Sequence, residues 1–144
     1  MKSHPLLILL IIIPTCLFAG NPDKVSLVDM FMGVKNSSNC VIGPQLPHGS
    51  VNPAPQTPNG GHNGYDENDV IRGFGQLHVS GIGWGRYGQV FISPQVGFKP
   101  GETEHDSPKS DEVATPYYYK VNLDRYKIKT EITPTHHSVY YRFT

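Results

Sequence analysis

The residues with the clearest chemical purpose lie in one glycine-rich segment, residues 71–95. Its centre is Trp84, the single tryptophan of the chain, which stands between Gly83 and Gly85. Because glycine has no side chain to cover a neighbour, we expect the indole to project from a loop. An aromatic face stacks on the apolar face of a pyranose ring, and the indole N–H can donate a hydrogen bond. The segment therefore predicts a sugar-binding position, with packing of the ring into the core or a domain interface as the alternative.

Other polar side chains of this segment could contact the same ligand. His78 and Ser80 are two residues apart in an expected strand over residues 77–80, so their side chains share a face. For His78 the alternative is a half-buried histidine with satisfied hydrogen bonds. A phosphate-binding loop is discarded because a strand, and not a helix, follows the glycines. The predicted substrate-binding residues are Trp84, His78, Ser80, Gly83 and Arg86.

The sequence offers no convincing catalytic pair and no metal site. Glycoside hydrolysis needs an acid and a base across the scissile bond, whereas the carboxylates here lie in polar stretches. The histidines lack zinc-type spacing, and the adjacent His136 and His137 are expected to point to opposite faces of a strand. Asp66, Glu67 and Asp69 lack the spacing of an EF-hand, so a solvated loop is the preferred interpretation. We therefore predict no catalytic and no metal-binding residue in this chain.

Strands must position the segment, because period-two alternation dominates the sequence. It predicts half-buried strands over residues 119–124 and 126–132. Residues 90–92 form a continuous apolar run, which predicts a more deeply buried strand. No window shows the apolar repeat of an amphipathic helix over three turns. We predict an all-β fold, an antiparallel β-sandwich with long Gly/Pro-rich loops.

Two stretches are predicted as loops, and a last strand is predicted at the end of the sequence. Residues 44–64 are rich in proline and glycine, and residues 99–116 are polar and charged. Inside a compact domain such loops are more often functional rims than linkers, with disorder as the alternative. In residues 138–144, Val139 and Tyr141 share one face with Phe143. No turn follows this strand, so we expect a fragment of a longer protein; the alternative is a true terminus at a sheet edge.

The first residues predict export. Lys2 provides a basic start, residues 6–13 form a short apolar run, and small residues follow, which is typical of a cleaved signal peptide. The run is much shorter than the about 20 residues that a membrane span requires. We expect a signal peptide over residues 1–20, a domain over residues 21–144 and a periplasmic or secreted location. Lipoprotein anchoring at Cys16 is the less favoured outcome.

The composition of the remaining domain excludes several partners. Removal of residues 1–20 leaves 11 basic and 12 acidic residues, a net charge of −1. A nucleic-acid partner would need a basic stripe, and a near-neutral surface does not suit a polybasic membrane binder either. Cys40 then has no partner for an internal disulfide, and we expect it to be a buried thiol.

Four motifs, in order along the chain, resemble one family. Residues 28–33 read Val-Asp-Met-Phe-Met-Gly, and residues 46–51 read Leu-Pro-His-Gly-Ser-Val. Residues 71–83 contain Ile-Arg-Gly-Phe and His-Val-Ser-Gly-Ile-Gly, and residues 114–121 read Ala-Thr-Pro-Tyr-Tyr-Tyr-Lys-Val. Each motif is weak alone, but together they span nearly the whole domain. The chain resembles the amino-terminal domain of glycoside hydrolase family 92, the exo-acting α-mannosidases.

The resemblance implies a division of labour between two domains. In the family, a β-sandwich precedes an α-helical toroid that supplies the catalytic acid, the base and most of a calcium site. The sandwich contributes a loop that closes over the substrate, which residues 80–87 match. The resemblance thus implies the substrate-closing domain of a secreted, calcium-dependent, inverting exo-α-mannosidase acting on mannose-containing glycans. Without the C-terminal catalytic domain, the fragment is expected to be inactive.

The sequence departs from the family motif at residues 86–89, and two alternative functions remain open. Residues 86–89 read Arg-Tyr-Gly-Gln where the family often has Asp-Tyr-Gly-Asp, so two acidic positions are lost and the linkage cleaved stays open. The first alternative function is a stand-alone carbohydrate-binding module that uses Trp84 without catalysis. The second is a structural sandwich whose role is to pack on a partner domain.

Overall fold

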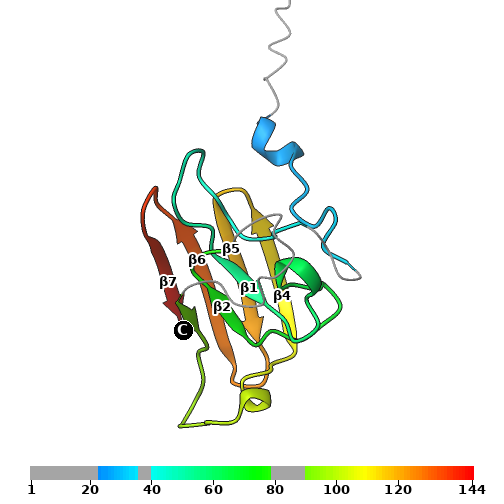
Figure 1. Ribbon diagram of the computed structural model, residues 1–144, viewed down its shortest axis with the longest axis vertical. Coiled ribbons are helices and arrows are strands. Elements are labelled where there is room, and N and C mark those ends of the chain that lie inside the picture. The colour runs from blue at the N-terminus through cyan, green and yellow to red at the C-terminus, as the bar shows by residue number, and fades with distance from the viewer. Residues whose placement is uncertain (1–22, 36–39, 79–89) are drawn as a thin grey trace, which may run out of the picture.

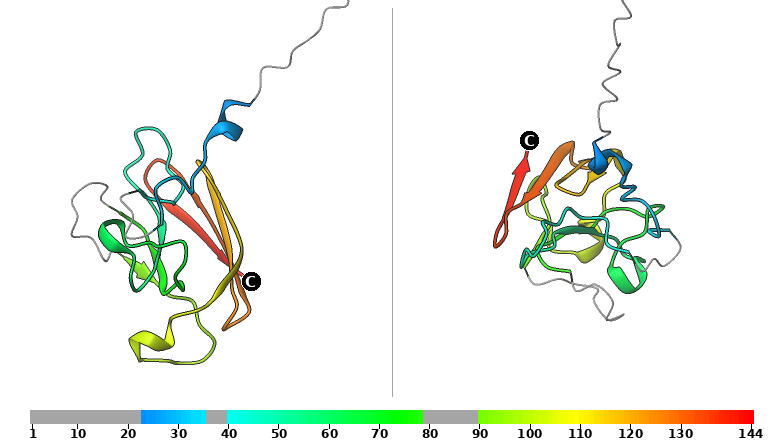
Figure 2. Two further views of the ribbon diagram at one scale, coloured as in Figure 1. Left: turned by 90° about the vertical axis from the view of Figure 1, so that its right-hand side faces the viewer. Right: turned by 90° about the horizontal axis from the view of Figure 1, so that it is seen from above.

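The computed structural model describes residues 23–35, 40–78 and 90–144, and these residues form two layers of antiparallel sheet (Figures 1 and 2). The smaller sheet has the order β1-β2-β3 and the larger one the order β4-β5-β6-β7. Among the described residues, helical structure is limited to short 3-10 turns, which confirms the predicted all-β sandwich. The strands are β1 (Ala54–Gln56), β2 (Gly73–Gly75), β3 (Phe91–Ile92), β4 (Lys109–Thr115), β5 (Tyr118–Leu123), β6 (Ile128–Pro134) and β7 (Val139–Phe143). The 3-10 turns are η1 (Lys24–Leu27), η2 (Gly61–Asn63) and η3 (Glu102–Glu104).

Three strands of the larger sheet, β5, β6 and β7, were predicted from period-two alternation. In β5, Tyr119, Val121 and Leu123 are buried, while the residues between them are half-buried on the other face. Strand β6 pairs with β5 and β7 on either side, with Tyr119 opposite Ile132 and Ile132 opposite Tyr141. The predicted strands over residues 119–124, 126–132 and 138–144 are therefore confirmed, with small shifts at their ends.

Strand β4 corrects the prediction that residues 99–116 form a loop. Its pairing with β5 shifts between Ser110 and Val113, and Asp111 has a φ of 49°, as in a β-bulge. The bulge leaves the Glu112 carboxylate beside the hydroxyl groups of Tyr65 and Tyr119, at 2.8 and 2.5 Å. A strand that breaks its own alternation in this way gives no period-two signal in the sequence.

The smaller sheet also differs from expectation. Strand β1 lies inside the predicted loop over residues 44–64, and all three of its residues are buried. Residues 90–92 were predicted as a deeply buried strand, but they are less buried than that: Val90 is 62% exposed, and Phe91 and Ile92 are half-buried. Strand β3 is the edge of a three-stranded sheet, so its apolar residues are covered from fewer directions than those of a central strand.

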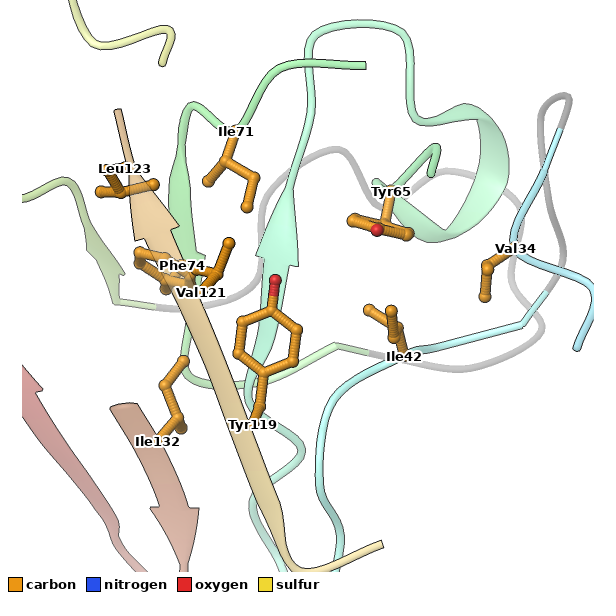
Figure 3. Packing of buried hydrophobic residues seen from close by; sticks show 9 residues of the cluster. All are labelled: Val34, Ile42, Tyr65, Ile71, Phe74, Tyr119, Val121, Leu123 and Ile132. Carbon is orange, nitrogen blue, oxygen red and sulfur yellow. The ribbon is translucent and has the colours of Figure 1, made fainter. Parts of the chain in front are cut away.

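The core lies between the two sheets and is closed at one side by irregular chain (Figure 3). Phe74 of β2 meets Tyr119 of β5 edge to face, with ring centroids 6.3 Å apart, which joins the two layers. The buried cluster comprises Val34, Ile42, Tyr65, Ile71, Phe74, Tyr119, Val121, Leu123 and Ile132.

Three further sequence expectations concern the surface. Cys40 is exposed and not buried, because its sulfur lies against Gly33 of the irregular N-terminal segment and outside the core. His136 and His137 form the turn between β6 and β7 and do not belong to a strand. Within residues 23–35, 40–78 and 90–144, no helix has the length and apolar character to cross a membrane.

Candidate functional site

Of the predicted substrate-binding residues, His78 is the one that the structure describes; Ser80, Gly83, Trp84 and Arg86 lie outside the described residues. His78 directly precedes residues 79–89, and Val90 follows them. The main-chain N–H of Gln76 donates to the carbonyl of Val90 at 3.1 Å, which extends the β2–β3 ladder up to this point. Gln76 and Val90, on either side of residues 79–89 (the Trp84 segment), therefore lie at the same end of the smaller sheet.

Asn52 fixes the position of His78. The main-chain N–H and the imidazole Nδ1 of His78 lie 3.1 and 3.3 Å from the main-chain carbonyl oxygen of Asn52. In return, the Asn52 side-chain amide donates to the carbonyl of His78 at 3.3 Å, and the Asn52 main-chain N–H donates to Gln76. Both residues are 6% exposed. His78, the last described residue before the Trp84 segment, is thus held by Asn52 through main chain and side chain together.

This geometry assigns the imidazole tautomer. A carbonyl oxygen can only accept, so Nδ1 of His78 carries a proton. Burial lowers the pKa of His78 from its ordinary value, although the hydrogen bond to Asn52 opposes the shift, and the neutral ring is favoured. A neutral imidazole has one N–H, so Nε2 is an acceptor. His78 is therefore a buried, neutral ring of defined orientation, and not the half-buried histidine of the alternative interpretation.

Two hydrogen-bond acceptors, one on His78 and one on Asn52, have no partner among the described residues. Among the residues that the structure describes, neither Nε2 of His78 nor Oδ1 of Asn52 has a hydrogen-bond partner, and both atoms are buried. A buried acceptor that stays unpaired costs about 1–3 kcal/mol, so such atoms are best explained by a donor that completes them. Hydroxyl groups of a polyol are suitable donors. Asn52 was missed by the sequence reasoning, because nothing in a Pro/Gly-rich stretch marks one asparagine as the partner of a distant histidine.

The acidic residues that follow η2 do not form a metal site. Asp66 Oδ1 accepts from the main chain of Asn68 and Asp69 Oδ2 from that of Asn59, at 2.9 and 2.8 Å. Glu67 pairs with Lys35 at 3.2 Å. In the described part of the chain, no three His, Cys, Asp or Glu side chains gather so that they could hold a metal ion.

Comparisons with known proteins agree with this fold. The profile of the glycosyl hydrolase family 92 N-terminal domain matches residues 27–144. Among solved structures, the chain is similar to a family GH92 α-mannosidase from Bacteroides thetaiotaomicron in complex with mannoimidazole, with 29% identity and a TM-score of 0.69. A second structure of that α-mannosidase gives 28% identity and a TM-score of 0.67. The gh92 family glycosyl hydrolase ccman5 gives 27% identity and a TM-score of 0.74.

The matched chains are much longer than this one. The similarity to the α-mannosidase covers 83% of this chain but 18% of that chain, and the similarity to ccman5 covers 85% and 19%. No curated protein matches the sequence. Since the profile covers residues 27–144, which hold both sheets and the His78–Asn52 pair, the chain belongs to glycosyl hydrolase family 92, as its N-terminal domain.

Proposed function

We propose that this chain is the substrate-closing N-terminal domain of a secreted, calcium-dependent, inverting exo-α-mannosidase that acts on mannose-containing glycans. The observation that carries the proposal is the family membership over residues 27–144, together with the similarity to an α-mannosidase solved with mannoimidazole. The signal-peptide pattern of residues 1–20 supports secretion or a periplasmic location.

The Trp84 segment is the part of the chain that meets the sugar in this proposal. Trp84 stacks on a pyranose face, with Ser80, Gly83 and Arg86 in the same segment. His78 and Asn52, at the start of the segment, accept hydrogen bonds from hydroxyl groups through Nε2 and Oδ1. Two buried acceptors in a fixed arrangement support this role, because a ligand with several hydroxyl donors can complete both.

The bond-breaking groups come from outside this chain. Inverting glycosidases use one carboxylic acid to protonate the leaving group and one carboxylate to activate water. In this proposal the C-terminal catalytic domain supplies both, together with most of the calcium site. What this chain contributes is substrate binding, orientation and exclusion of water. The chain alone is therefore expected to be inactive.

The test compares the complete protein with residues 21–144 alone. Each is incubated with α-linked mannobiose, and proton NMR follows which anomer of mannose appears first. The complete protein is expected to release β-mannose first, because inversion converts the α linkage, and residues 21–144 should release none. Removal of calcium with a chelator should abolish release, and added calcium should restore it. Release of α-mannose first, or no hydrolysis of any α-mannoside by the complete protein, contradicts the proposal.

A further inference from the structure

A concave site lies between β3 and η3, the yellow-green coil at the foot of Figure 1. Arg72 stands just before β2 and Ser93 just after β3. Gln76 and Val90 lie at the other ends of these two strands. The groove has a volume of about 590 Å³, within the usual size of small-molecule sites. Its lining residues, which define the β3–η3 groove, are Arg72, Phe91, Ser93, Pro100, Glu102 and His105.

One wall of the groove is fixed by Arg72. Its guanidinium group donates from Nε and Nη2 to the two carboxylate oxygens of Asp106, at 2.6 and 2.9 Å. Its Nη1 donates to Glu102 of η3. The Arg72 side chain is 14% exposed and that of Asp106 18%, so this bidentate pair is largely screened from water. A planar guanidinium held at both edges positions the groups around it.

The segment behind this wall is held from a second direction. Arg125 Nη1 donates to the main-chain carbonyls of Thr103, Glu104 and Asp106, at 3.0, 3.0 and 2.9 Å. The hydroxyl of Tyr126 donates to the carbonyl of Glu104 at 2.6 Å. These bonds satisfy the carbonyls around η3 and connect it to the β5–β6 turn. The groove is therefore preorganised before any ligand arrives.

The apolar part of the groove comes from Phe91 and Pro100. The Phe91 ring lies directly against Gly73: a Cβ added to that glycine would be 2.5 Å from Phe91 Cζ. Gly73 thus makes room for the ring, and the half-buried ring keeps part of its surface toward the groove. An aromatic surface of this kind can pack against the C–H face of a pyranose.

The polar part offers acceptors. The hydroxyl of Ser93 donates to the carbonyl of Arg72 at 2.7 Å, so its oxygen receives the 2.9 Å hydrogen bond from Nδ1 of His105. The other ring nitrogen of His105, Nε2, is not engaged in the contact with Ser93 and is a further polar atom of the ring. The carboxylate of Glu102 is a second acceptor, on a side chain that is 63% exposed.

The charge balance selects the class of ligand. Two carboxylates, those of Glu102 and Asp106, surround one guanidinium, so the groove does not favour an anion. The described residues include no three-ligand cluster for a metal ion. A neutral molecule with hydroxyl donors and one apolar face fits both the acceptors and the Phe91–Pro100 surface. We propose that the β3–η3 groove is a carbohydrate-binding subsite for a hexose unit, separate from the His78–Asn52 pair. That the hexose is mannose rests on the proposed function.

The test is a calorimetric titration of the complete protein with a thio-linked α-mannobioside, which the enzyme cannot hydrolyse. It is done on Trp84→Ala, which weakens binding at the Trp84 segment, and on that variant combined with Phe91→Leu or Glu102→Gln. Phe91→Leu keeps apolar bulk but removes the flat ring, and Glu102→Gln changes an exposed side chain. Phe98→Leu is the matched control, because Phe98 is 86% exposed, lies in the same stretch and does not line the groove.

The expected result is a site that persists in Trp84→Ala and is weakened about tenfold by either groove substitution, a difference of 1.4 kcal/mol, with no change from Phe98→Leu. Absence of any site in Trp84→Ala overturns the proposal, and so does equal binding by the groove variants and their parent. The outcome is separable from the proposed function. If the protein hydrolyses α-mannosides but shows no groove site, only the subsite proposal fails. If it binds in the groove without hydrolysis, only the proposed enzymatic function fails.

Discussion

The main-chain carbonyl oxygen of Asn52 accepts two hydrogen bonds from His78, one from its main-chain N–H at 3.1 Å and one from the imidazole Nδ1 at 3.3 Å. The orientation of the ring is thus set by main chain, which no substitution of Asn52 removes. The other ring nitrogen, Nε2, is the part of His78 that can act on a ligand. Substitutions that keep a group at the position of one ring nitrogen and remove the other therefore test whether Nε2 contacts a ligand.

His78→Asn and His78→Gln should differ in activity. Asparagine can keep a donor near the position of Nδ1 but has no atom at Nε2, whereas glutamine reaches further and can supply an acceptor there. In the complete enzyme we expect His78→Asn to lower kcat/KM for an α-mannoside about tenfold, as for one lost hydrogen bond. His78→Gln should keep more of the activity. Unfolding midpoints serve as the control, and an active, wild-type-like His78→Asn would exclude a ligand contact at Nε2.

The pH dependence of stability should carry a contribution from His78. An unfolded histidine takes up a proton near pH 6.5, but burial lowers the pKa of His78 in the fold. Below that pH the unfolded state binds more protons, so stability falls as pH decreases toward the lowered pKa and is fully retained above pH 6.5. Thermal unfolding at pH 7.5 and 5.5 measures this loss. His78→Gln should show a smaller loss than wild type, and identical losses would contradict the buried neutral ring.

Glu131 should contribute to stability in acid. The hydroxyl of Tyr118 donates to it at 2.6 Å and Nε of Arg142 at 2.7 Å, and these hydrogen bonds lower the pKa of Glu131 from 4.5 to about 2. A lowered pKa means that the contribution is present above pH 4.5 and is lost as pH falls toward 2. Acid unfolding followed by circular dichroism should be less steep for Glu131→Gln. An unchanged acid profile would show that these contacts do not stabilise the fold.

Tyr119→Phe should destabilise the domain far more than Tyr140→Phe. Tyr119 is fully buried, and its hydroxyl is 2.5 Å from Glu112, which also pairs with Lys109 at 2.8 Å. Loss of one donor to this carboxylate, whose side chain is 11% exposed, should cost about 1–3 kcal/mol. Tyr140 is 67% exposed, and its change should stay within about 0.5 kcal/mol. Urea unfolding gives both values; equal stability of the two variants would mean that the Glu112 network does not stabilise the fold.

The sequence was informative where one side of a strand is buried and the other is not. Tyr119, Val121 and Leu123 show this alternation, so β5 was predicted with its buried face. Strand β4 was not, because the bulge near Asp111 brings the charged Glu112 to buried tyrosines that come from elsewhere in the chain. Strand β1 was missed for a different reason. Its three residues are all buried, one of them is Pro55, and they carry neither alternation nor β-branched side chains.

The candidate site was predictable only in part. The spacing of residues 77–80 pointed to His78, but its burial and its tautomer depend on Asn52, a partner 26 residues away. The β3–η3 groove was also not foreseen, since Arg72, Ser93 and His105 come together through tertiary contacts that leave no local pattern. Family motifs predicted the family correctly. The roles of Ser80, Gly83, Trp84 and Arg86 stay predictions.

Kinetics of Trp84→Ala in the complete enzyme test the central claim most directly. Shielding half of an aromatic side chain from water contributes about 2–3 kcal/mol. We therefore predict that kcat/KM for an α-mannoside falls roughly 30- to 150-fold, while Phe98→Ala, at an exposed aromatic position, stays near wild type. A Trp84→Ala enzyme that turns over its substrate as the wild type does would contradict a substrate-closing role for this domain.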